Sequence, residues 1–390
     1  MPLLKKIKPD WPLLVLCGVG MYLLFSFISI TIAQVFLAVA LIGWLGFHIR
    51  TKRKIRIPGF YIPLLVYVGL SLLVSLFSVN PGISFLDGRE MLLYLIVPIV
   101  FTGFVSLKGL VTVNRVLLVS FAVTCVYSFY YYAFSSTPGE RITGFMGHWM
   151  TQAGLLLLFC SLAAALFLFK KRIIRYAWGG AFILGLPLIL LTLTRNSWVG
   201  LFAAGVVIVL LWKPKALLLV PVLAALFFLV SPGYIKDRVI STFDLKNPTN
   251  KQRFEYWSAG LKIIRDFPLH GTGPDTVEMV FQHPKYGLSE IARSNVHLHN
   301  NVLQIAAERG LFTLTAWLVF VIWLCVDLLR LLKRRDGPVF PYAAGALAAL
   351  VGLFSAGLFE YNFGDSEVVV LFLYIATVPF ALKRMEEESS

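Results

Sequence analysis

Residues 148–169 read HWMTQAGLLLLFCSLAAALFLF, and the next three residues, 170–172, are KKR. A helix needs roughly 20 apolar residues to cross the hydrocarbon core of a bilayer, and this run is of that length. Lysine and arginine directly after an apolar run are typical of the cytoplasmic side of a membrane. The stretch therefore predicts a transmembrane helix that ends in the cytoplasm.

The same pattern of apolar runs and basic loops recurs along the whole chain. Of its 390 residues, 58% are hydrophobic and only 14% are charged, which no ordinary soluble domain matches. We expect an all-α polytopic membrane protein that forms a single membrane-embedded domain over residues 1–390. The twelve predicted spans lie near residues 12–29, 31–48, 60–78, 89–106, 110–134, 148–169, 174–193, 197–212, 215–231, 311–330, 338–359 and 367–382. The first two form one apolar run, and a single long helix there would invert the topology of all later spans.

The charged residues agree with this topology. At the ends assigned to the cytoplasm lie 22 of the 35 lysines and arginines, among them Lys5, Lys6, Lys8 and the run from Arg50 to Arg56. Positive residues near short loops mark the cytoplasmic side, so both termini are expected there. The net charge of +15 then follows from the topology, and we expect no nucleic-acid partner.

A long loop on the outer side, residues 232–296, separates the ninth and tenth spans. Loops of this length are usually functional or disordered. Residues Asn250 to Phe267 have the pattern of an amphipathic helix. Its apolar stripe consists of Phe254, Trp257, Leu261 and Ile264. A second short helix is predicted to start at Asp275, with Glu278 as its capping-box partner. We expect an ordered cap, and we expect residues 232–310 to contribute part of the active site.

Four polar motifs fall on the outer side. They are GERITG at 139–144, TLTRNS at 192–197, PLHGTG at 268–273, which follows Arg265, and HLHNN at 297–301. Arg141 and Arg195 stand at span ends against the positive-inside trend, and the guanidinium group suits phosphate oxygens. Ser197 is predicted to cap the eighth span, whose N-terminus would then add backbone donors to the same anion site.

The two histidines of the last motif are candidates for proton transfer at neutral pH. If a helix begins before His297, then His297, Asn301, Gln304 and Glu308 form a polar stripe on one face. If the helix begins near Asn300, His299 lies in the entry turn, and its direction stays open. Periodicity alone favours His297. No carboxylate stands at a fixed offset from this pair, so the sequence predicts neither a metal site nor a cofactor.

Taken together, the motifs resemble the O-antigen ligase and polymerase superfamily of bacterial membrane proteins. The resemblance is carried by Arg141-x-Thr-Gly144, by Thr194-Arg195, by Pro268-Leu-x-Gly-x-Gly273, and by His299-Asn300 running on to Gln304, Glu308 and Gly310. It covers essentially the whole chain, and it implies the helical fold of C-type membrane glycosyltransferases with one large periplasmic loop.

The resemblance implies an O-antigen ligase of the bacterial inner membrane. Such an enzyme moves O-antigen glycan from undecaprenyl pyrophosphate to the lipid A core on the periplasmic face, by metal-independent inverting transfer among membrane lipids. The family motif favours His299 over His297 as the base. The implied catalytic residues are His299, Arg195 and Arg141, and the implied substrate-binding residues are Arg265, His297, Asn300, Asn301 and Gln304.

Two alternatives stay open. An O-antigen polymerase would use a lipid-linked glycan as the acceptor instead of the lipid A core. A transporter of lipid-linked sugars belongs to a different class, in which ionisable residues at mid-membrane and repeated halves are common. The predicted span interiors of this chain carry almost no charge, which favours glycosyl transfer.

The predicted topology can be tested by cysteine labelling in intact cells. A cysteine at Ser289 should react with an impermeant thiol reagent, because residues 232–296 are expected outside the cytoplasm. A cysteine at Thr51 should stay unlabelled until the inner membrane is permeabilised. The reverse pattern would show that residues 12–48 cross the membrane only once.

Overall fold

The computed structural model describes residues 10–135, 137 and 139–389, and these residues form helices and no strand. Seven of the described helices are long and apolar enough to cross a membrane. They are α2 (Ile30–Thr51), α6 (Leu107–Phe134), α7 (Trp149–Phe169), α9 (Arg195–Trp212), α15 (Asn301–Leu331), α16 (Val339–Ala356) and α17 (Ser366–Ser389). The chain is therefore a polytopic helical membrane protein.

Shorter helices occupy the other predicted spans. Apolar helices of fewer than 18 residues are α1 (Trp11–Phe25), α3 (Tyr61–Ser75), α8 (Arg175–Leu191) and the pair η3 (Pro214–Leu219) and α10 (Val220–Val230). Near 89–106, the chain forms η1 (Arg89–Leu95) and then α5 (Ile96–Gly103). Only part of that segment is α-helical, so the count of twelve spans stays a prediction.

The long apolar run at the start of the chain forms two helices, α1 and α2, and Ser29 is the residue before α2. Small residues bring the two helices into contact. A Cβ atom on Gly18 would lie 2.6 Å from the backbone nitrogen of Ala40, and one on Gly43 would lie 2.8 Å from Cβ of Leu14. Such close approach is typical of helix pairs in membranes, and the paired positions show that α1 and α2 are antiparallel.

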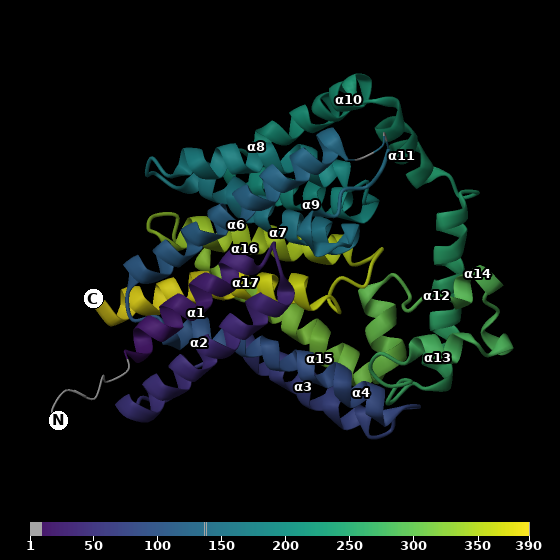
Figure 1. Cartoon of the computed structure of the whole chain (residues 1–390), viewed down its shortest axis with the longest axis horizontal. Coiled ribbons are helices and arrows are strands. Elements are labelled where there is room, and N and C mark those ends of the chain that lie inside the picture. The colour runs from purple at the N-terminus through teal and green to yellow at the C-terminus, as the bar shows by residue number, and fades with distance from the viewer. Residues whose placement is uncertain (1–9, 136, 138, 390) are drawn as a thin grey trace.

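Helices α7, α16 and α17 form the centre of the bundle (Figure 1). Every residue of α7 from Thr151 to Leu166 is buried. Helix α9 packs closely on α16, since a Cβ atom on Gly200 would lie 2.5 Å from the carbonyl oxygen of Gly352. The apolar core is thus surrounded by the less buried helices, among them α2, α9 and α15.

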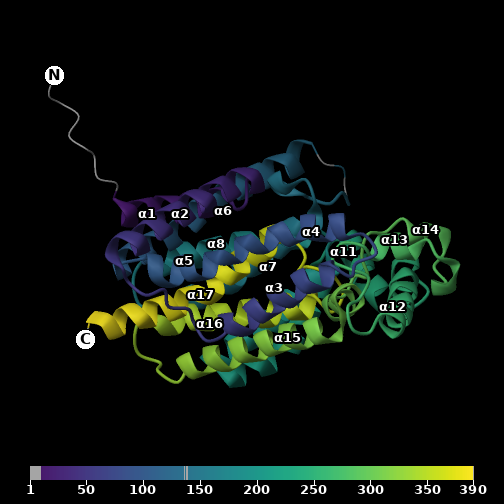
Figure 2. The same cartoon turned by 90° about the horizontal axis from the view of Figure 1, so that it is seen from below.

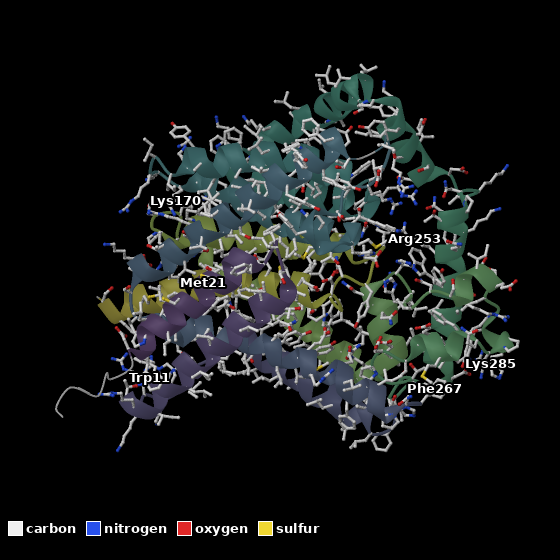
Figure 3. The ribbon with its side chains drawn as sticks, viewed as in Figure 1. Trp11, Met21, Lys170, Arg253, Phe267 and Lys285 are labelled. Carbon is white, nitrogen blue, oxygen red and sulfur yellow. The ribbon has the colours of Figure 1, made fainter. Side chains whose placement is uncertain are left out.

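The long loop that was predicted on the outer side forms its own group of short helices at one end of the bundle, and the C-terminal end of α17 lies at the other (Figures 1 and 2). This group consists of α11 (Gly233–Phe243), α12 (Pro248–Asp266), α13 (Val277–Phe281), η4 (Pro284–Tyr286) and α14 (Glu290–Arg293). Figure 3 shows Lys170 at the end opposite to Arg253. The N-terminal lysines Lys5, Lys6 and Lys8 lie outside the described residues.

Helix α12 covers almost the predicted range, but only two residues of its predicted apolar stripe, Trp257 and Ile264, pack against the small core of the loop. Phe254 and Leu261 are 50% and 61% exposed. The buried apolar face instead consists of Tyr256, Ala259, Gly260 and Ile263. These residues face a small core that includes Phe281 and Leu298, so the tertiary partner, and not the more hydrophobic stripe, decides the orientation.

The predicted cap at Asp275 is wrong. Helix α13 begins at Val277, after Thr276. Asp275 has a φ of 56°, a left-handed turn conformation that aspartate tolerates better than most residues. The chain therefore turns at Asp275 and enters the helix two residues later.

The motif at 268–273 ties the outer loop to a break in α15. Gly310 has a φ of 75°, and the helix is interrupted there. The backbone N–H groups of Thr272 and Gly273 donate to the carbonyl oxygens of Ala307 and Glu308, at 2.9 and 2.8 Å. These carbonyls lose their helical partners at the break, so the loop supplies the missing donors. The short helix α4 (Pro81–Gly88) joins the same contact, because Ser84 Oγ donates to the carbonyl oxygen of Pro274 at 2.7 Å.

We expect Gly310→Ala to lower the thermal unfolding temperature of the purified protein in detergent. An alanine there would adopt a positive φ, and its Cβ atom would collide with the carbonyl group of Leu269. The expected loss in free energy of unfolding is about 1–3 kcal/mol. Gly205→Ala is the control, because Gly205 lies within α9 with open space around its Cβ position. Equal unfolding temperatures for the two variants would show that the backbone at Gly310 does not require glycine.

Candidate functional site

His299 lies in the entry turn of α15. The helix begins at Asn301, and the side-chain oxygen of Asn300 accepts from the backbone N–H of Leu303 at 3.0 Å, so Asn300 is the N-cap. His299 itself has a φ of 49°. The polar stripe that favoured His297 therefore does not form, because His297 precedes the helix.

Both histidines contact one buried carboxylate, Glu360, in the turn between α16 and α17. The Nδ1 atom of His299 lies 2.9 Å from Oε2 of Glu360, and the Nε2 atom of His297 lies 3.4 Å from Oε1. The backbone N–H of Tyr361 also donates to Glu360 at 3.1 Å. Burial alone would raise the pKa of Glu360, but the adjacent His299, His297 and this N–H group lower it to about 2.

The charge on Glu360 determines the tautomer of His299. A carboxylate only accepts hydrogen bonds, so the proton of a neutral His299 lies on Nδ1. Its Nε2 atom then carries the free lone pair and can accept a proton. A carboxylate that orients a histidine in this way also stabilises the imidazolium that forms on proton transfer.

On the side of His299 lies a cavity of about 130 Å³, which we call the arginine cavity. Its lining includes Arg141, Arg195, Arg238, Arg253, Tyr256 and His299. The four arginines come from four segments: the loop after α6, the start of α9, α11 and α12. Arg195 is held by hydrogen bonds from Nη1 to the carbonyl oxygen of Ser241 at 2.8 Å and from Nη2 to Oδ1 of Asn250 at 3.1 Å.

These arginines lack acidic partners. None of the four forms an ion pair within the part of the chain that the structure describes. Burial, together with the nearby charge of Arg238, lowers the pKa of Arg141, and burial lowers the pKa of Arg238 and of Arg253. A guanidinium group nevertheless stays charged at neutral pH, so the cavity carries uncompensated positive charge and suits an anion with several oxygens.

Comparison with known proteins identifies the family. Residues 180–318 match the model of the O-antigen ligase family. This part of the chain is similar to an O-antigen ligase domain, which supports membership of the chain in that superfamily. A search of curated proteins found no match. The matched part runs from α8 into α15 and contains Arg195, Arg238, Arg253 and both histidines. Membership indicates an enzyme of the glycosyl-transfer kind, with lipid-linked glycans among its substrates.

The fold brings some of the predicted site residues together and leaves others apart. Arg141, Arg195 and His299 line the arginine cavity. His297 and Gln304 line a second cavity, together with Glu360.

Two predicted substrate-binding residues, Asn300 and Asn301, make structural contacts in the ligase domain. Besides capping α15, Asn300 donates through Nδ2 to the carbonyl oxygen of Leu358 at 2.9 Å. Asn301 is buried and bonds to Asn362 and to the backbone of Phe363. The two asparagines thus join the start of α15 to the turn that carries Glu360.

Arg265, predicted from the loop, is exposed in the last turn of α12 and does not line the arginine cavity of the ligase domain. Arg253 does so instead, because it lies one helical turn before the buried Tyr256. Ser197 is likewise not a cap, since Thr194 precedes α9 and Ser197 is buried in its first turn.

Sequence analysis missed Glu360, Arg238 and Arg253. For Glu360, the available signal was an acidic residue directly after the eleventh predicted span. Its proximity to His299 depends on tertiary packing between residues 61 positions apart.

The same proximity brings together three side chains of the types that bind metal ions. Ligand atoms of His297, His299 and Glu360 all lie within 4.8 Å of one another. The carboxylate that the sequence could not supply at a fixed offset is therefore present. The nitrogen and oxygen atoms that would bind a metal are, however, the atoms that hydrogen-bond each other directly at 2.9 Å. A metal ion would have to displace that bond.

Proposed function

We propose that this protein is an O-antigen ligase, which transfers O-antigen glycan from undecaprenyl pyrophosphate to the lipid A core on the periplasmic face of the inner membrane. The observation that carries the proposal is the pair of His299 and the buried Glu360 beside four arginines that have no acidic partner among the described residues. This reaction requires a base for the acceptor proton next to a site that binds the pyrophosphate anion.

The arginine cavity would hold the pyrophosphate of the donor. Pyrophosphate is a stable anion, so the bond from the anomeric carbon to its oxygen can break without a strong acid. The enzyme needs to neutralise the charge that develops on that oxygen, and preorganised cations do this effectively in a site shielded from water. Arg141 and Arg195 serve this role, and Arg238 and Arg253 replace the predicted Arg265.

His299 would act as the base. The acceptor hydroxyl attacks the anomeric carbon, its proton passes to Nε2 of His299, and the carrier leaves as undecaprenyl pyrophosphate. A single direct displacement of this kind inverts the anomeric configuration. Glu360 is a positioning residue, since it orients the imidazole and stabilises its protonated form.

A third cavity offers a place for the carrier lipid. It has a volume of about 130 Å³ and shares Arg195, Asn196 and Arg253 with the arginine cavity. Its apolar lining includes Val199, Leu245, Phe254, Trp257 and Phe359. The exposed Phe254 and the neighbouring Trp257 of α12 would then contact the first isoprene units while the arginines hold the pyrophosphate.

The assay is transfer of a labelled lipid-linked glycan in detergent. We expect His299→Ala to lower the transfer rate by on the order of a hundredfold or more, the usual scale for a positioned base, with little change in donor binding. His297→Ala should lower the transfer rate less than His299→Ala does, and His283→Ala, at an exposed loop histidine, should leave the rate unchanged.

The arginine variants are measured in the same assay. Arg195→Lys keeps the charge but loses the bidentate fork of the guanidinium group, so it should lower the transfer rate, and Arg195→Ala should also weaken donor binding.

The product tests the identity of the acceptor. Label on the lipid A core supports the ligase, and a ladder of longer lipid-linked glycans would identify a polymerase. Movement of the donor across the membrane without any covalent product would identify a transporter. Near-normal transfer by a well-expressed His299→Ala, together with an inactive His297→Ala, would exchange the roles of the two histidines.

We also expect metal-independent turnover. Excess chelator should lower the transfer rate by less than about tenfold, equivalent to roughly 1.4 kcal/mol of barrier, because arginines neutralise the pyrophosphate. The measurement is the rate in detergent before and after chelator. Complete loss of activity that Mg²⁺, Mn²⁺ or Zn²⁺ restores would show that a metal ion is required, with His297, His299 and Glu360 as the first ligands to examine.

A further inference from the structure

The cavity that Glu360 and His297 line is separate from the cluster of four arginines, none of which lines it. It has a volume of about 260 Å³, close to the lower limit of roughly 300 Å³ for ligand pockets. Met150 and Asn196 line both this cavity and the arginine cavity. The histidine–carboxylate cluster also contacts both cavities, because His299 lines the arginine cavity whereas His297 and Glu360 line the other one.

The charge of this second cavity, which we call the acidic cavity, is opposite to that of the first. Its acidic lining residues are Asp87, Asp275, Glu308, Glu360 and Asp365. Arg309 pairs with Asp87 at 2.7 Å and with Glu308 at 3.1 Å, so the positive charge of Arg309 balances part of the negative charge of this cavity.

Among the described residues, no arginine or lysine lines the acidic cavity. Its histidines are His148 and His297, and partial desolvation lowers the pKa of each, which favours the neutral form. An anionic group would therefore meet carboxylates here without a permanent cation.

Two buried polar side chains face the acidic cavity without a partner. Asn196 and Ser197 lie in the first turn of α9 and line this cavity, and they are only 6% and 2% exposed. Neither side chain forms a hydrogen bond with another residue in the ranges 10–135 and 139–389 that surround it. Buried polar groups in folded proteins are normally hydrogen-bonded, so these two indicate a polar ligand.

We infer that the acidic cavity is the acceptor subsite of the proposed transfer, which takes a sugar through hydroxyl or amino groups and excludes a sugar bearing phosphate or carboxylate. Carboxylates accept hydrogen bonds from hydroxyl and amino groups, and the free groups of Asn196 and Ser197 supply further donors and acceptors. The inference rests on the proposed function.

The opposite charges would keep the two substrates apart. Pyrophosphate is attracted to the arginine cavity and repelled by the acidic cavity, so the donor binds in one orientation. The acceptor would then approach the cluster of His297, Glu360 and His299 from the acidic cavity, while the leaving group lies in the arginine cavity. That approach is the one that an inverting displacement needs.

The test measures the KM values of donor and acceptor separately, with purified full-length protein in detergent. Asp275→Asn removes one charge, and asparagine tolerates the φ of 56° at this position. Ser197→Ala removes one hydroxyl group. For each variant we expect the acceptor KM to rise by about tenfold, as for the loss of one hydrogen bond in a buried site, while the donor KM stays within about twofold.

Two control variants show whether an effect is specific to the acidic cavity. Glu278→Gln changes an exposed acidic residue three positions after Asp275 that does not line the acidic cavity, and both KM values should stay unchanged. Arg238→Ala, in the arginine cavity, should raise the donor KM and leave the acceptor KM unchanged. Thermal unfolding in detergent confirms that each variant is folded.

A second arm tests charge selection. Wild-type protein should discriminate against a lipid A core acceptor whose terminal sugar carries an added phosphate, and Asp275→Asn should discriminate less. Unchanged acceptor KM values in both variants, or a donor KM that rises as much as the acceptor KM, would overturn the inference. The proposed function fails separately, if wild-type protein transfers glycan to no acceptor at all.

Discussion

Glu360 is only 4% exposed, and its carboxylate keeps its charge because hydrogen-bond donors surround it. Two imidazoles and the N–H of Tyr361 provide those donors, and removing them would leave a buried charge at a high cost in free energy. Since the histidines precede α15 and Glu360 follows α16, the carboxylate joins the two ends of the candidate site. Asn300 and Asn301 form hydrogen bonds between the start of α15 and the same turn, and these bonds stabilise the position of Glu360 relative to the histidines.

The arginines of this protein fall into two electrostatic groups. Arg309 is buried with its charge satisfied by Asp87, Glu308 and the hydroxyl group of Tyr361. The arginines around His299 are partly buried and have no acidic neighbour at ion-pair distance among the described residues. A buried cation without a counter-ion is unfavourable in the free protein, so the second group is arranged for an anion that arrives with the substrate. Arg309, in contrast, stabilises the fold.

Sequence reasoning could predict what depends on local pattern. Arg141 and Arg195 stand at span ends on one side of the membrane, and the motif that begins at His299 precedes an apolar segment, so their shared location follows from topology. The range of α12 follows from its composition. Its buried face does not, because the helix carries apolar residues on two faces and only the core around Phe281 and Leu298 selects one of them. Glu360 was missed for a similar reason, since its contact with His299 joins distant parts of the chain.

The contact between Gly200 and Gly352 fixes the distance between α9 and α16, and with it the distance between the two ends of the candidate site. Gly200 lies five residues after Arg195 on α9, and Gly352 lies eight residues before Glu360 on α16 and the following turn. Since the two helices touch through backbone atoms, the spacing between the leaving-group end and the base end of the site does not depend on flexible side chains. The reacting groups are therefore held at a separation set by the main chain, and changes in lipid composition or in the outer loop should alter access to the site more than its internal dimensions.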